Sequence, residues 1–220
     1  MKNHLIISED FYSIQGEGFC SGHPAVFLRL SGCNLDCDFC DSKQLWTKGK
    51  KYSFTQILDK WHKSGWLSKL QSGAHLVITG GEPLLQQDFL WLFIQKLDKT
   101  LKLQTYIELE TNATILLNNN FLQRINQVNA SPKLVNDKVL LQLSKLNKTK
   151  FKFVIKEKND LDYILNNYVT PFKIKRQNIC LMPEGKTREA IREKSAMVVE
   201  LCKKYMLNFS PRLQINIGIK

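Results

Sequence analysis

The sequence predicts an α/β fold with a mostly parallel sheet, and two observations support this prediction. Short apolar runs typical of buried strands alternate with segments whose apolar residues recur at helical spacing. Repeated alternation of this kind favours parallel strands joined by right-handed crossovers. The chain has 220 residues, which is enough for a substantial core. We therefore expect residues 1–220 to form a single domain.

The expected strands and helices follow one another along the whole chain. Residues 5–14, mixed apolar and polar, predict an edge strand or an extended arm. A capping-box pattern of Ser53 and Gln56 predicts the start of the first helix, and the segment from Gly65 to Gly73 is expected to end it. The further strands are expected at 24–30, 75–79, 103–109, 128–130, 151–155, 178–182 and 213–219, and the further helices at 89–97, 118–125, 136–147, 159–167 and 187–206.

Composition and charge narrow the class of protein. No apolar stretch reaches the roughly 18 residues of a membrane span, and the first ten residues lack the apolar core of a signal peptide. We therefore expect a cytoplasmic protein with reduced thiols and no membrane partner. The net charge is +12, from 32 basic and 20 acidic residues, but the lysines are scattered without a long run. This distribution does not favour direct binding to nucleic acid.

Three cysteines lie within eight residues, at Cys33, Cys37 and Cys40. A structural zinc site takes four ligands, usually as two pairs, and this loop supplies three at unequal spacing. Iron–sulfur clusters are held by cysteine thiolates, and three thiolates on four irons leave one iron open to a small molecule. Accidental clustering is the third interpretation, whereas Cys180 and Cys202 are expected to be ordinary core thiols.

Polar segments follow several of the predicted strands. In a parallel α/β sheet or barrel such segments meet at the carboxyl edge, where ligands bind. Arg29 interrupts the end of the apolar run 24–30, so its side chain is expected at that edge. Near the start of the chain, two glycines flank Glu17 and predict a tight turn, with Glu17 as its cap. The segments that should converge are the cysteine loop, 79–83, 110–112, 131–133 and 182–184.

Two of these segments resemble motifs of the radical S-adenosylmethionine (SAM) superfamily. They are the spacing Cys33-x-x-x-Cys37-x-x-Cys40, with an aromatic residue before the last cysteine, and Thr79-Gly80-Gly81-Glu82-Pro83. Further features resemble the 7-carboxy-7-deazaguanine synthase family in order along nearly the whole chain. This resemblance implies a shortened (β/α) partial TIM barrel of the radical SAM type, open on one side, with mostly parallel strands. The further features are 14–18, Arg29, Gly32-Cys33, 40–42, 110–112 and 131–133.

The resemblance also implies roles for individual residues. Cys33, Cys37 and Cys40 would bind a [4Fe-4S] cluster, and together with Arg29 and Glu110 they would form the catalytic set. Ser42 would bind Mg²⁺, at a position where relatives usually carry threonine. The implied SAM contacts are Phe39, Cys40, Asp41, Gly81, Ser131, Pro132 and Lys133, and the implied pterin contacts are Ile14, Gln15, Gly16, Arg29, Thr79 and Glu110.

The implied activity is that of a carbon–nitrogen lyase in queuosine precursor biosynthesis. A 5′-deoxyadenosyl radical would take the C6 hydrogen of 6-carboxy-5,6,7,8-tetrahydropterin, and Mg²⁺-assisted ring contraction with loss of ammonia would give 7-carboxy-7-deazaguanine. An electron donor such as flavodoxin or ferredoxin and a homodimeric assembly are also implied. The sequence departs from the family pattern at Met182, because many relatives carry glutamine before the proline that corresponds to Pro183.

Two alternatives have distinct grounds. A radical SAM activase that makes a glycyl radical on a protein partner shares the cluster motif and a similar size. The order of the 14–18 turn, Arg29 and Ser42 weighs against it, because these residues suit a small anionic ligand and a metal. A zinc-bound nucleic-acid module would account for the cysteines and the positive charge.

Overall fold

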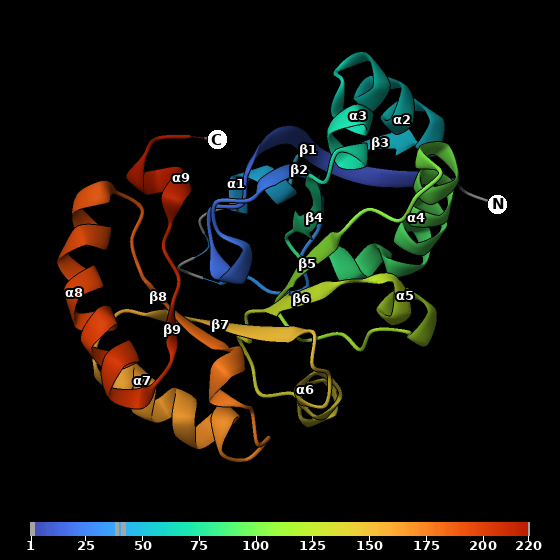
Figure 1. The fold of residues 1–220 in the computed structure, drawn as a ribbon. Helices are drawn as coiled ribbons and strands as arrows, with labels where there is room; N and C mark the ends of the chain where they lie inside the picture. Colours follow the sequence, from blue (N-terminus) through green and yellow to red (C-terminus); the bar gives the residue numbers. More distant parts are fainter. Residues whose placement is uncertain (1–2, 38–39, 41–42, 220) are drawn as a thin grey trace. The chain divides into compact units, whose positions relative to one another are not determined.

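The structure is a computed structural model that describes residues 3–37, 40 and 43–219. The chain forms two compact units, each assembled from segments distant in the sequence (Figure 1). The second unit carries most of the net charge, with 19 basic and nine acidic residues, against 13 basic and 11 acidic residues in the first. The first unit contains residues 1–13, 23–111 and 117–126, and the second contains residues 14–22, 112–116 and 127–220.

The strands of the first unit lie in the order β3-β1-β2-β4-β5. Parallel pairing joins β2 to β4 and β4 to β5, whereas β1 and β3 are antiparallel. The prediction that residues 5–14 form an edge strand is wrong, because the unpredicted β3 pairs with β1 and takes the edge. The third predicted strand begins at Ile107 instead of Leu103, which is 37% exposed. The bounds are β1 (His4–Ile14), β2 (Pro24–Leu30), β3 (Lys50–Ser53), β4 (His75–Gly80) and β5 (Ile107–Thr111).

The helices of the first unit begin largely where their capping residues predict. The Ser53 side chain accepts a hydrogen bond from the Gln56 backbone, and Gln56 returns one to Ser53, which confirms the capping box. Trp61 on the same helix is fully buried and packs edge-on against Phe93 of the longest helix in this unit. The bounds are α1 (Lys43–Trp46), α2 (Phe54–Lys63), α3 (Trp66–Gln71), the 3₁₀ helix η2 (Pro83–Gln86), α4 (Gln87–Leu101) and α5 (Asn119–Arg124).

The strands of the second unit are parallel, in the order β6-β7-β8-β9. The predicted strand 213–219 is wrong, since that segment starts with a helix, α9 (Leu213–Asn216), and the last strand is the two-residue β9 before it. The alternating pattern misled the prediction, because backbone N–H groups of this segment donate to Arg212 and Leu213 instead of to a strand. The bounds are β6 (Gln127–Ala130), β7 (Thr149–Ile155), β8 (Ile179–Pro183) and β9 (Asn208–Phe209).

The helices of the second unit match most of the predicted positions. Thr187 caps α8 by accepting a hydrogen bond from the Ala190 backbone, and Figure 1 shows this long helix beside β8 and β9. Within the described ranges, no helix combines the length and the apolar character that a bilayer crossing requires. The bounds are η1 (Gly18–Cys20), α6 (Asp137–Ser144), α7 (Asn159–Ile164), the π-helical η3 (Leu165–Val169), η4 (Arg176–Asn178), α8 (Arg188–Tyr205) and α9 (Leu213–Asn216).

The Ser53 cap provides a direct test of the first unit. We expect Ser53→Ala to lower the free energy of unfolding by about 1 kcal/mol, because it leaves the Gln56 backbone N–H without its partner. Ser68→Ala, at an exposed site within α3, is the matched control and should change stability by less than about 0.5 kcal/mol. Urea unfolding followed by circular dichroism measures both; equal effects would contradict the capping role.

Candidate functional site

Three polar side chains lie near the carboxyl ends of neighbouring strands in the first unit, at equivalent positions. Arg29 on β2 and Thr79 on β4 are register partners. Glu110 on β5 follows Leu109, the register partner of Ile78, so it lies one residue along from that pair, beside Thr79. All three are half-buried. Because they stand at equivalent positions of parallel strands, they face the same side of the sheet.

Arg29 is held by a partner that the sequence did not reveal. Its Nε lies 2.9 Å from Oε1 of Glu9 on β1, and both side chains are 18% exposed. This ion pair fixes the direction of the guanidinium group. A carboxylate ligand would therefore be bound by the two terminal nitrogens of Arg29, which can form a bidentate pair.

The cysteine loop carries three half-buried cysteines, Cys33, Cys37 and Cys40. None of the six cysteines of the chain, all of which the structure describes, forms a disulfide. The Cys40 backbone N–H donates to the Cys37 carbonyl over 3.2 Å, which holds these two residues close together. By contrast Cys202 is buried, and burial raises the pKa of its thiol to about 11. That thiol stays protonated at neutral pH and is a poor metal ligand.

The glycine segment after β4 packs directly on the start of the cysteine loop. A Cβ atom built on Gly81 would overlap the Gly32 carbonyl oxygen and lie 2.6 Å from the Cys33 Cβ. Only glycine therefore allows this approach. Half-buried thiols beside a closely packed glycine backbone fit an iron–sulfur cluster and a polar ligand, because soft thiolates bind iron and backbone groups remain near it.

Glu82 stabilises the contact between Gly81 and the cysteine loop through buried hydrogen bonds. Its backbone N–H donates to the Gly32 carbonyl over 2.9 Å. Its carboxylate is fully buried and accepts hydrogen bonds from the Thr111 hydroxyl, at 2.9 and 3.0 Å, and from the Leu84 backbone, at 3.0 Å. Glu82 thus joins the ends of β2, β4 and β5 to the cysteine loop.

Three sequence-predicted site residues lie outside the described residues. They are Phe39 and Asp41, expected to contact SAM, and Ser42, expected to bind Mg²⁺. The neighbouring Lys43, at the start of α1, forms an ion pair with Asp36 inside the cysteine loop.

The second unit contains the predicted turn of residues 14–18. Gln15 and Gly16 are buried, and the Gly22 backbone donates to the Gln15 carbonyl over 2.7 Å. Glu17 does more than the predicted capping of this turn. Its carboxylate binds Lys152 of β7 at 2.8 Å and Arg212 at 3.1 Å, so it is an ion-pair centre.

The charge state of Glu17 follows from these contacts. Burial raises its pKa, but the charges of Lys152 and Arg212, with hydrogen bonds from Lys152 and Gln214, outweigh this effect and lower the pKa to about 2. Glu17 is therefore ionised throughout the physiological range.

The segment 131–133 lies where it was predicted, directly after β6. Pro132 is buried, and Ser131 and Lys133 are half-buried. Asn112, in the predicted segment 110–112, accepts hydrogen bonds from the Thr114 backbone at 3.1 Å and from the Thr114 hydroxyl at 2.6 Å. Met182 is buried in β8.

One polar cluster in the first unit was missed by sequence reasoning. His75 stacks between His23 and Tyr106, with ring centroids at 3.7 and 4.1 Å, and its Nδ1 lies 2.7 Å from Oε1 of Glu108. Glu108 is fully buried. His75 and Ile107 begin β4 and β5, so this cluster sits toward the amino ends of the strands, away from Arg29 and Thr79. Its residues come from three separate stretches of the sequence, around positions 23, 75 and 106–108, and no local motif marks it.

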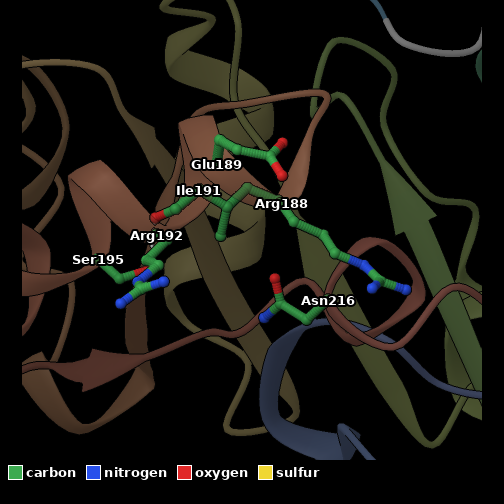
Figure 2. Close-up of a pocket in the computed structure, with 6 residues that line it drawn as sticks. All are labelled: Arg188, Glu189, Ile191, Arg192, Ser195 and Asn216. Carbon is green, nitrogen blue, oxygen red and sulfur yellow. Dashed lines mark hydrogen bonds between the residues drawn. The ribbon is translucent and has the colours of Figure 1, made fainter.

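A hollow of about 490 Å³ lies in the second unit, between the start of α8 and the C-terminal helix α9 (Figure 2). Arg188 extends from α8 and donates a hydrogen bond to the Ile215 carbonyl over 3.1 Å. None of the sequence-predicted site residues that the structure describes lines this hollow. Its lining residues are Arg188, Glu189, Ile191, Arg192, Ser195 and Asn216.

Comparison with known proteins gives consistent results. The family model described as "4Fe-4S single cluster domain" matches residues 14–152. A 7-carboxy-7-deazaguanine synthase of Halobacterium salinarum is 31% identical, over 96% of this chain and 89% of the relative. One of Hyperthermus butylicus is 32% identical, over 98% and 93%.

A solved structure shows the fold. The crystal structure of QueE from Escherichia coli has a TM-score of 0.70 and 24% identity, and the match covers 94% of this chain and 93% of that one. This likeness confirms the predicted mixed α/β fold with an open, mostly parallel sheet of the radical SAM type.

The Gly81 contact generates a first prediction for this site. We expect Gly81→Ala to destabilise the protein by about 1–3 kcal/mol, because the added methyl overlaps Gly32 and Cys33. The displaced loop should retain less than about half of the wild-type iron after anaerobic reconstitution. Gly65→Ala is the control. Its φ of 72° makes alanine strained there, but the added Cβ meets no neighbouring atom, so this variant should lose about 1 kcal/mol of stability without losing iron. Unchanged iron binding by Gly81→Ala would contradict the packing role.

Glu17 generates a prediction about pH. Its pKa is about 2 in the folded chain and 4.5 for an unperturbed glutamate, so its stabilisation is fully present above about pH 4.5 and is lost as the pH falls toward 2. Relative to Glu17→Gln, we expect the wild-type chain to lose up to about 3 kcal/mol across this range. Urea midpoints at several pH values measure the difference, with Glu200→Gln as an exposed control. A difference independent of pH would overturn the assignment.

Proposed function

The chain belongs to the 7-carboxy-7-deazaguanine synthase family of radical SAM enzymes, and we propose that it carries out this family's reaction through the residues described above. That reaction converts 6-carboxy-5,6,7,8-tetrahydropterin to 7-carboxy-7-deazaguanine with loss of ammonia. The observation that carries the assignment to this chain is the group of three half-buried cysteines, Cys33, Cys37 and Cys40, the first of which packs against Gly81.

The cysteine loop is proposed to hold the iron–sulfur cluster. Cys33, Cys37 and Cys40 would supply its thiolate ligands, and the close approach of Gly81 keeps side chains away from that position. When bound, the cluster and SAM supply one-electron chemistry and a carbon radical that can take hydrogen from the substrate. The backbone of Gly81 and residues 131–133 are proposed to orient SAM, together with Phe39 and Asp41.

The polar residues at the strand ends are proposed to bind the pterin. Arg29, oriented by Glu9, would bind the substrate carboxylate through its terminal nitrogens. Glu110 would accept hydrogen bonds from amino and ring N–H groups, and Thr79 beside it can donate or accept. Residues Ile14, Gln15 and Gly16 would contribute backbone contacts from the buried turn.

Ser42 is proposed as a protein ligand for Mg²⁺. Its hydroxyl oxygen is the type of ligand that this hard cation prefers, and Mg²⁺ keeps several waters that other groups can orient. The proposal rests on the position of Ser42 just after the Cys40-Asp41 pair.

The electron donor is proposed to be an acidic flavodoxin or ferredoxin. The surplus of ten positive charges in the second unit would attract such a partner electrostatically.

A homodimer is proposed as well, since the edge strand β3 and its neighbour β1 expose Tyr52 and Ile6, at 36% and 42%. We further propose that residues 1–220 act as one cytoplasmic radical SAM domain, without direct nucleic-acid contact.

The decisive assay uses purified, anaerobically reconstituted protein. With SAM, a reductant, Mg²⁺ and 6-carboxy-5,6,7,8-tetrahydropterin, we expect mass spectrometry to detect 7-carboxy-7-deazaguanine and ammonia release. Cys37→Ala should abolish turnover, because the cluster would lose a ligand. Chelation of Mg²⁺ should slow the reaction. Ser42→Ala should weaken Mg²⁺ binding, so the turnover of this variant should respond less to a given concentration of added Mg²⁺.

Three outcomes would contradict this function. Deoxyadenosine formed only when a protein partner is added would favour a glycyl-radical activase. Zinc without iron or sulfide in anaerobically isolated protein would favour the zinc module. Full cluster content and turnover by Cys37→Ala would remove the cysteine loop from the mechanism. Cys202→Ala is the matched control, because that buried thiol should be dispensable for the cluster.

A further inference from the structure

Glu17 is the centre of a buried polar cluster in the second unit. Its Oε2 accepts from Lys152 Nζ at 2.8 Å, and its Oε1 accepts from Arg212 Nε at 3.1 Å and from Gln214 Nε2 at 2.6 Å. The three charged side chains are 16%, 9% and 7% exposed for Glu17, Lys152 and Arg212. We call these four residues the Glu17 cluster.

Backbone contacts join the same two segments of chain. The Leu213 N–H donates to the Gly16 carbonyl over 2.9 Å, and the Gly18 N–H donates to the Ser210 hydroxyl over 2.7 Å. A side chain on Gly16 would overlap the Gln214 carboxamide. The turn of residues 14–18 and the C-terminal segment of residues 210–216 are therefore packed as one piece.

The C-terminal segment is held from its other side as well. Arg212 also donates to the Gly185 carbonyl in the loop before α8. Arg188 of α8 donates to the Ile215 carbonyl over 3.1 Å, and Figure 2 shows it reaching toward the segment that carries Asn216. The segment thus links the turn to the loop before α8 and to α8 itself.

We propose that Glu17 is a positioning residue for the pterin substrate: it holds the 14–18 turn against the 210–216 segment and so fixes the conformation of Ile14, Gln15 and Gly16, which are proposed to contact the pterin. This inference rests on the proposed function, which assigns these three residues to the pterin. Glu17 itself acts through the cluster and not through contact with the ligand.

The composition of the cluster fits a positioning role better than a purely stabilising one. A buried ion pair is often no more stabilising than apolar residues of similar size, but it fixes one geometry through directed hydrogen bonds. Gln214 adds a second argument, since its Oε1 is buried against Gly16 with no hydrogen-bond partner. An unpaired buried acceptor is unfavourable, so the packing of Gln214 on Gly16 fits placement of the turn better than added stability.

The test compares Glu17→Gln with the wild-type enzyme. We expect the KM for the pterin to rise at least about tenfold, because the turn loses its charged anchor, while kcat changes less. The iron content and the slow formation of deoxyadenosine without pterin should stay at wild-type levels. Gln214→Leu, which removes one neutral donor, should raise KM by a smaller factor of about three to ten.

Hydrogen–deuterium exchange of the apoprotein supplies a readout that does not depend on activity. We expect Glu17→Gln to speed exchange in peptides covering residues 14–18 and 210–216. The Gly18 amide donates to Ser210 and the Leu213 amide donates to Gly16, so both amides are protected only while the two segments stay packed together. Asp98→Asn is the matched control. It breaks a similarly buried pair with Arg124 in the other unit, so it should lower stability without changing exchange in these peptides or the KM.

The possible outcomes separate the two proposals. A wild-type enzyme that loads its cluster but forms no deazapurine would overturn the proposed function. With an active wild-type enzyme, an unchanged KM in Glu17→Gln would overturn the positioning role. An equal rise of the KM in Asp98→Asn would overturn it as well. If Glu17→Gln does not fold, Gln214→Leu decides the question, and unchanged exchange and KM in that variant would refute the inference.

Discussion

The packing of Gly81 against Gly32 and Cys33 is the constraint on which the first unit's site depends. It brings the ends of two parallel strands into backbone contact at the base of the cysteine loop. Glu82 secures the contact from the buried face through Gly32 and Thr111. Because side chains alternate along strands, the same register turns Arg29, Thr79 and Glu110 to the opposite face. One close approach thus organises both faces of the strand ends.

Features encoded by neighbouring residues could be predicted from the sequence. The strand at Pro24–Leu30 and the start of α2 at the Ser53 cap agree with the structure, because apolar runs and capping boxes are short-range patterns. The spacing of three cysteines within eight residues indicated a metal site, and the resemblance of this motif to the radical SAM superfamily implied an iron–sulfur cluster, which the family comparison confirms. These predictions succeeded because their information lies within a few residues of each element.

Features that depend on distant partners could not be predicted. Glu17 meets Lys152 and Arg212 across 135 and 195 residues, and nothing in the local sequence distinguishes a cap from an ion-pair centre. The pairing of Glu9 with Arg29 and of His75 with Glu108 likewise arises from strand neighbours. The helix at Leu213–Asn216 was mistaken for a strand, because its backbone bonds to distant groups, the Gly16 carbonyl and the Arg188 side chain, which the local alternation does not reveal.

The Glu17 cluster also constrains how this sequence can change over evolutionary time. Loss of the carboxylate alone would leave the two cations Lys152 and Arg212 buried beside each other, at a considerable electrostatic cost. A tolerated path would replace the cations first, or would replace all three positions together with residues of similar volume. Positions 17, 152 and 212 should therefore co-vary among relatives, although they lie far apart along the chain.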